Sequence, residues 1–95
     1  MFARVTHFQM KPDSTDDAMA MIEKLKPQIM ALPGMHQFIN AMNSDGHGCV
    51  VALVESRATS DANAEAVKAL WSSFSDMLAA PPTAEGFDVQ VNWAP

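Results

Sequence analysis

The sequence of 95 residues is poor in cysteine, tyrosine and charge, with one Cys, no Tyr and only 18% Asp, Glu, Lys and Arg. Because Cys49 has no second cysteine to pair with, the chain cannot form an internal disulfide, which is typical of a reducing compartment. Cys49 also lies in an apolar run without a neighbouring cation to activate its thiol, so we expect a small buried hydrophobe there. A typical soluble domain has about 25% charged residues. The low charge content therefore indicates a surface that a partner covers.

The sequence also lacks a membrane-spanning run, a basic cluster and a recognisable export signal. Its longest uncharged stretch, residues 27–44, is interrupted by Pro33-Gly34 and contains several amide side chains, which a bilayer core does not accept. With 6 Lys and Arg against 11 Asp and Glu, no surface is predicted to attract a phosphate backbone. We therefore expect a cytoplasmic protein with neither a membrane nor a nucleic acid as its partner.

What the chain does contain is a regular pattern of apolar residues, which make up 48% of it against a net charge of −5. This composition predicts a folded chain and one domain over residues 1–95. Strands are expected at residues 2–10, 35–43, 49–55 and 87–93, the last with strict apolar-polar alternation. Helices are expected from Ser14, as N-cap, to Leu32 and from Thr59-Ser60-Asp61 to Pro81-Pro82. Asp45-Gly46 predicts a hairpin between the second and third strands.

The element order predicts an α+β fold of the ferredoxin-like type, βαββαβ. Right-handed crossovers then give a four-stranded antiparallel sheet in the order 4-1-3-2, with both helices on one face. Strands one to three offer no wholly polar side, so the face without helices would expose apolar residues to water. A second copy of the chain, related by a two-fold axis, is the simplest cover for it. We therefore expect a homodimer that forms through the open sheet face.

Three segments carry a resemblance to a known family. They are Val5-Thr6-His7-Phe8-Gln9-Met10-Lys11-Pro12, Leu32-Pro33-Gly34-Met35 and Val50-Val51-Ala52-Leu53-Val54-Glu55-Ser56. Through them the chain resembles the dimeric α+β barrel superfamily and, within it, the antibiotic biosynthesis monooxygenase-like proteins. The resemblance implies two sheets packed face to face and a pocket between sheet and helices in each subunit. It also implies a choice among cofactor-independent oxygenases of phenols and quinols, haem-degrading enzymes, and proteins without known chemistry.

The chain departs from the haem-degrading members at one position. Those members have a strand Asn together with a Trp and a His on the second helix. Trp71 would correspond to the Trp, but no His occurs between Ser60 and Ala80. The aromatic ring and the His that many oxygenase members have near the start of this helix are missing as well. We therefore expect neither haem nor any other cofactor.

Four residues are candidates for chemistry. His7, in the first strand, would be the catalytic base if Asp88 oriented its imidazole to take a proton from a phenol; the alternative is a structural histidine. Trp71 would be a wall of the substrate pocket or part of the core. Asn40 and Asn92 would bind a substrate oxygen or form hydrogen bonds in the dimer. The three histidines lack the spacing of metal ligands, so no metal site is predicted.

Two functions from different classes remain open. The first is a homodimeric cofactor-independent monooxygenase that acts on a small aromatic or quinol-type molecule. The second is a homodimer of the same fold that binds a small apolar ligand, or another partner, without turnover. They differ in one structural feature, which is whether His7 and Trp71 border the same cavity.

Overall fold

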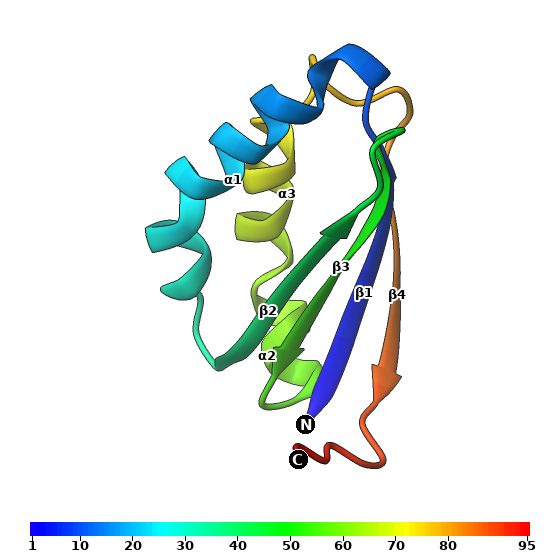
Figure 1. Cartoon of the computed structure of the whole chain (residues 1–95). Coiled ribbons are helices and arrows are strands. Elements are labelled where there is room, and N and C mark those ends of the chain that lie inside the picture. Colours follow the sequence, from blue (N-terminus) through cyan, green and yellow to red (C-terminus); the bar gives the residue numbers. More distant parts are fainter.

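The computed structural model describes residues 1–95 as a four-stranded antiparallel sheet with the helices packed on one side (Figure 1). The sheet order is β2-β3-β1-β4, with antiparallel pairing throughout. The predicted α+β ferredoxin-like fold and the strand order 4-1-3-2 are therefore confirmed. The elements are β1 (Phe2–Gln9), the 3-10 helix η1 (Pro12–Ser14), α1 (Thr15–Met30), β2 (Met35–Met42), β3 (His47–Val54), α2 (Arg57–Ala62), α3 (Ala64–Ser72) and β4 (Thr83–Asp88).

The central strand β1 divides its side chains between the two faces of the sheet, since successive residues of a strand point to opposite sides. Phe2, Thr6 and Phe8 are buried under the helices, whereas His7 is exposed. We call the side covered by helices the helix face and the other side the open face. Even-numbered residues of β1 belong to the helix face and odd-numbered residues to the open face.

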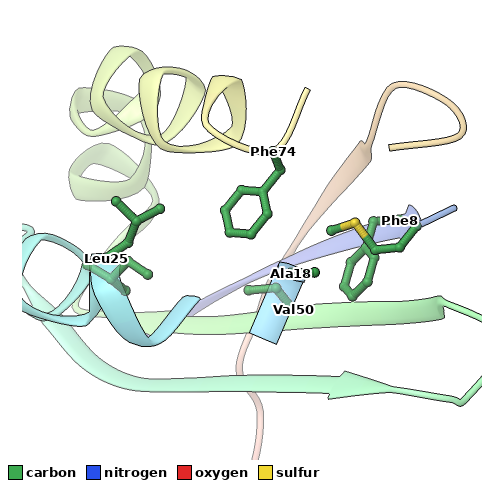
Figure 2. Close-up of a cluster of buried hydrophobic side chains, with 7 residues drawn as sticks. Phe8, Ala18, Leu25, Val50 and Phe74 are labelled. Carbon is green, nitrogen blue, oxygen red and sulfur yellow. The ribbon is translucent and has the colours of Figure 1, made fainter. Parts of the chain in front are cut away.

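The hydrophobic core lies between the helix face and α1, and Figure 2 shows its cluster of seven buried side chains. In α1, Ala18, Leu25 and Ile29 are buried, and their spacing of seven and four residues places them on one stripe. By contrast, α3 has no buried residue. The helix layer therefore rests on the sheet through few fully enclosed side chains. The cluster consists of Phe8, Met10, Ala18, Leu25, Ile29, Val50 and Phe74.

The hairpin between β2 and β3 turns at Asp45-Gly46, as the sequence predicts. Gly46 has φ of +88°, a conformation that residues with a Cβ rarely adopt. Its carbonyl accepts a hydrogen bond from the backbone N–H of Met10 at 2.9 Å. A Cβ on Gly46 would lie 2.5 Å from the carbonyl oxygen of Met10. The turn thus depends on glycine both for its conformation and for its contact with the end of β1.

We expect Gly46→Ala to lower the free energy of unfolding by about 1–3 kcal/mol, because it combines an unfavourable φ with a backbone clash. Urea denaturation followed by circular dichroism measures this change. Ser44→Ala, in the same turn and exposed, is the control and is expected to stay within about 0.5 kcal/mol of the parent protein. Equal stabilities for the two variants would contradict the role given to Gly46.

Two predicted elements differ in the structure. The last strand covers residues 83–88 instead of 87–93, because β1 begins at Phe2, opposite Asp88, and no strand lies beside residues 89–95. The predicted long second helix is two helices, α2 and α3, which meet at Asn63. Ser14 is the N-cap residue of α1, as predicted, but its side chain forms no capping hydrogen bond. The side chain that does cap a helix is that of Ser56, which accepts a hydrogen bond from the N–H of Thr59 at 3.1 Å.

Three rows of side chains cross the open face from β2 to β4. The middle row contains Ile39, Val51 and Val5 and ends at Glu85 on β4. Ile39 is 44% exposed. The other side chains of the open face are also half-buried or exposed, because no other part of the chain packs on this face. The rows on either side of it are Gln37, Leu53, Ala3 and Phe87, and Ala41, Cys49, His7 and Thr83.

Candidate ligand cavity

A cavity of about 70 Å³, partly open to solvent, lies between the helix face and the helices. The strands contribute its floor, and α1, α3 and the segment after α3 contribute its walls. Fourteen of its 17 lining residues are hydrophobic. Small-molecule sites are typically apolar clefts with a few polar groups that orient the ligand. This cavity has that composition, and it corresponds to the pocket that the family resemblance implies.

Aromatic side chains form one wall of the cavity. Trp71 lies between Phe8 and Phe74, with 5.8 Å between ring centroids in both pairs and tilts of 49° and 55°. Tilted rings at this distance attract one another beyond the effect of area burial. The wall is thus held in place by rings from β1, α3 and the turns after α3. It gives this side of the cavity an aromatic lining.

Three polar residues, Arg4, Thr6 and Asn40, complete the lining. Thr6 is buried on the floor of the cavity. Asn40 is exposed, on the edge strand β2, so its amide lies where the cavity meets solvent. The Nε atom of Arg4 is buried and has no hydrogen-bond partner. The cavity therefore offers one cationic group and no carboxylate to a ligand.

Of the four predicted site residues, the structure brings two together. Trp71, from α3, and Asn40, from β2, both line the cavity. His7 is on the open face, so the sheet separates it from the cavity within one chain. Asn92 is exposed in the segment 89–95, with its Nδ2 atom 3.7 Å from the sulfur of Met1. The roles given to these residues stay predictions.

The expected contact between His7 and Asp88 is wrong. In the antiparallel pairing of β1 with β4, His7 lies opposite Thr83, and Asp88 lies at the other end of the strand. The Nε2 atom of His7 is instead 3.3 Å from a carboxylate oxygen of Glu85. Asp88 forms an ion pair with Arg57 of α2, 3.7 Å away. The register of β4, which the sequence misplaced, decides both pairings.

Arg4 is the functional candidate that the sequence reasoning missed. It is the one charged residue among the helix-face positions of β1, where Phe2, Thr6 and Phe8 are buried. A charge at an otherwise core-facing position is a recognisable signal, because an ionised group is costly to bury without a partner. The signal requires knowing which face of β1 the helices cover.

No metal or haem site is found among the described residues. No group of three or more His, Cys, Asp or Glu side chains is placed to hold a metal ion. The cavity lining contains no imidazole or thiolate that would ligate a haem iron. At about 70 Å³ the cavity is also smaller than the roughly 150 Å³ that accommodates benzene. The residues present therefore do not fit haem.

A membrane-spanning helix is also absent, because every helix of the structure is too short or too polar to cross a bilayer.

The chain was compared with known proteins at the levels of sequence and structure. No family model and no curated protein matches the sequence. Among solved structures, a protein of unknown function from Nitrosomonas europaea is 17% identical, with a TM-score of 0.82 over 99% of this chain and 93% of the other. A crystal structure of an antibiotic biosynthesis monooxygenase is 16% identical, with a TM-score of 0.77 over 94% and 98% of the two chains.

A third solved structure has bound ligands. It is a variant of MhuD with two manganese protoporphyrin IX molecules per active site, and it is 14% identical to this chain, with a TM-score of 0.79 over 100% of both chains. Likeness at these identities concerns the fold. The fold is that of the antibiotic biosynthesis monooxygenase-like proteins, so the resemblance drawn from the sequence is confirmed at this level.

Proposed function

Since the chain has the fold of the antibiotic biosynthesis monooxygenase-like proteins, we propose that it binds a small aromatic or quinol-type molecule in its cavity and oxidises it with O₂, without a cofactor. The observation that carries the proposal is the cavity itself. It combines an aromatic wall around Trp71 with a few polar groups, among them Arg4 and Asn40. A planar, electron-rich ring would stack on the wall while its oxygen substituent faces the polar groups.

The lining supports the ionised form of such a substrate. A guanidinium in apolar surroundings stabilises a nearby phenolate, which is the electron-rich species that reacts with O₂. In the simplest case, a CH₂ group conjugated with the phenolate becomes C=O. One atom of O₂ enters the product and the other leaves in water, and the substrate supplies all four electrons. Arg4 and Asn40 would orient the oxygen substituent, while Trp71 and its neighbours exclude water.

The second candidate is ligand binding without turnover, and one observation favours it. The cavity lining contains no His, Asp, Glu or Lys that would take a proton from the substrate. His7, the predicted base, is on the open face. If His7 acts as a base, its substrate must lie on that face. Otherwise the phenol must ionise in water before it binds.

An oxygen electrode distinguishes the two candidates. We expect the protein to accelerate O₂ uptake by a panel of quinols above the rate in buffer. Trp71→Leu should lower this rate about tenfold, which corresponds to ~1.4 kcal/mol of aromatic contact with the ring. Met30→Leu is the control, because Met30 is 48% exposed on α1 and outside the cavity.

The outcomes of this assay separate the roles of the residues as well. An unchanged rate in His7→Ala is expected, because the sheet lies between His7 and the cavity. A large loss of O₂ uptake in His7→Ala would support His7 as the catalytic base and would place the substrate on the open face. Rates equal to those in buffer, with quinols that bind, would favour the binding protein over the oxygenase.

We also propose that two chains form a homodimer through the open face. Monomeric proteins rarely expose contiguous apolar patches larger than a few hundred Å². Four strands spaced ~4.8 Å apart, with about eight residues each at ~3.3 Å, give this face roughly 500 Å². Its central residues, Val5, Ile39 and Val51, are apolar, as a second copy of the same sheet requires.

The segment after β4 would add to this interface. A stable interface buries about 800 Å² per partner, which is more than the flat area of the sheet. Phe87, Val91 and Trp93 are exposed by 50%, 57% and 89%, and the last two lie in residues 89–95, beside which no strand lies. Packing of these side chains on the partner would supply the remaining area.

A further inference from the structure

We propose that the ligand of the cavity is an anion, an aromatic carboxylate or phenolate of about one ring, and that Arg4 is the residue that selects it. The inference rests on the proposed function only in taking the cavity as the ligand site, and it does not require turnover. It concerns the charge of the ligand, which neither the fold nor the neighbouring structures specify.

The position of Arg4 directs its side chain to the cavity. It lies in the middle of β1, between Ala52 of β3 and Gly86 of β4, on the helix face. Both cross-strand neighbours are small, so neither offers a polar side chain to the guanidinium. Gly86 has no room for a Cβ, which would lie 2.2 Å from the ring of Phe2. Arg4 thus has small apolar neighbours within the sheet and borders the cavity.

The guanidinium of Arg4 lacks a protein partner. Its Nε is buried without a hydrogen bond, and the two ion pairs of the chain involve other residues. Arg4 as a whole is half-buried, and a cationic group with a buried donor that no protein atom satisfies gains from pairing with an anion. Arg57, the other arginine on this side of the sheet, shows the contrast, since it pairs with Asp88 and lies 4.5 Å above the ring of Phe2. The unpaired Arg4 is a group that an anionic ligand would satisfy.

The lining indicates which anion fits. It contains no Asp or Glu, so nothing inside the cavity competes with the ligand for Arg4. A planar guanidinium matches two carboxylate oxygens through parallel N–H donors, and Asn40 offers a further donor at the mouth. The apolar remainder and the wall around Trp71 require that the rest of the ligand be aromatic. The enclosed volume of about 70 Å³ is less than a single ring needs, so a one-ring ligand must extend through the open side of the cavity or displace the helices.

The net charge of the chain opposes the binding of anions. A measured preference for an anion would therefore identify a local cationic group. The chain carries a net charge of −5, so its overall field repels anions. A preference for an anion must therefore come from a local group. Contact within an apolar cavity is also screened less by salt than an attraction between exposed charges.

The test compares two probes of similar shape, benzoate and the uncharged benzamide, by isothermal titration calorimetry. We expect the protein to bind benzoate at least about tenfold more tightly, the effect of one charge-assisted hydrogen bond. Arg4→Met should abolish the preference, because it weakens the binding of benzoate much more than that of benzamide. Arg4→Lys should retain part of the preference, because lysine keeps the positive charge but lacks the two parallel N–H donors of the guanidinium. Arg57→Met is the matched control and should keep the full preference.

Each other outcome overturns the inference. Equal affinities of the unmodified protein for the two probes would do so even if Arg4→Met failed to fold. A preference that survives in Arg4→Met, or that disappears in Arg57→Met, would place the anion elsewhere. Benzamide binding without a preference for benzoate would leave the proposed aromatic site intact, and failure of both probes to bind would remove the site as well. Oxygen uptake by quinols is measured separately, so absence of turnover does not affect the result.

Discussion

Val51→Asp is expected to convert a dimer into a folded monomer. Val51 lies in the middle row of the open face, between Val5 and Ile39 on the adjacent strands. In a two-fold dimer the substitution occurs twice at the interface, and it would bury two carboxylates without cationic partners. Each buried unpaired charge costs several kcal/mol. We expect the dissociation constant to rise more than about 1000-fold, which corresponds to ~4.2 kcal/mol.

Analytical ultracentrifugation at micromolar concentration measures this change. The unmodified protein should sediment at twice the chain mass of 10.3 kDa and the variant at the chain mass. Met19→Asp introduces the same charge at an exposed position of α1, in the helix layer, and should leave the dimer intact. A monomer in the unmodified protein would refute the homodimer. A dimer that persists in Val51→Asp would place the interface on another surface.

The largest loss of stability is expected for Phe8→Ala. Phe8 is 5% exposed and belongs to the core cluster, where its ring contacts that of Trp71. Truncation of a buried Phe costs about 3–5 kcal/mol, because apolar contacts are lost and a void remains. The void would extend a cavity that already exists beside this residue, so the surroundings have little reason to collapse onto it. A domain of this size has a total stability near the lower end of ~5–15 kcal/mol.

Thermal unfolding by circular dichroism, at one fixed protein concentration, checks this prediction. The midpoint should fall by more than about 12 °C, from the usual 4–8 °C per kcal/mol in small domains. Met19→Ala is the control, because Met19 is 45% exposed and Ala is a good helix former; its midpoint should change by no more than about 4 °C. Similar midpoints for the two variants would show that Phe8 is not a core residue.

The sequence predicted the sheet well where local pattern and tertiary pairing agree. Asp45-Gly46 marks its hairpin because only glycine suits the turn, and the apolar run after His47 is a central strand in the structure. The last strand was misplaced because the alternation from Phe87 to Trp93 is a local property. The strand itself is defined by its partner, β1, which ends its pairing opposite Asp88. Residues 83–86 show little alternation and still pair.

The candidate site was predicted less completely, for a related reason. Trp71 and Asn40 were identified by residue type, and both line the cavity. Histidine is the usual proton acceptor at neutral pH, which makes His7 a candidate base by residue type, but the face of the sheet on which it lies depends on the odd-even alternation of β1. Arg4 is missed by sequence reasoning because the sequence alone does not show which face of β1 the helices cover. The undetermined orientation of β1 therefore explains both the misplacement of His7 and the omission of Arg4.

The alternation in β1 has a further consequence for how such a protein can diverge. Under the proposed cavity site and the proposed dimer, substitutions at even positions, such as Arg4 and Thr6, would change ligand binding, whereas substitutions at odd positions, such as Val5 and His7, would change assembly. The two properties are encoded in neighbouring codons and yet can vary independently. Insertion of a single residue in the middle of β1, between Val5 and Thr6, would exchange the faces of all residues on one side of the insertion. We therefore expect point substitutions, and not insertions or deletions, to have shaped this strand.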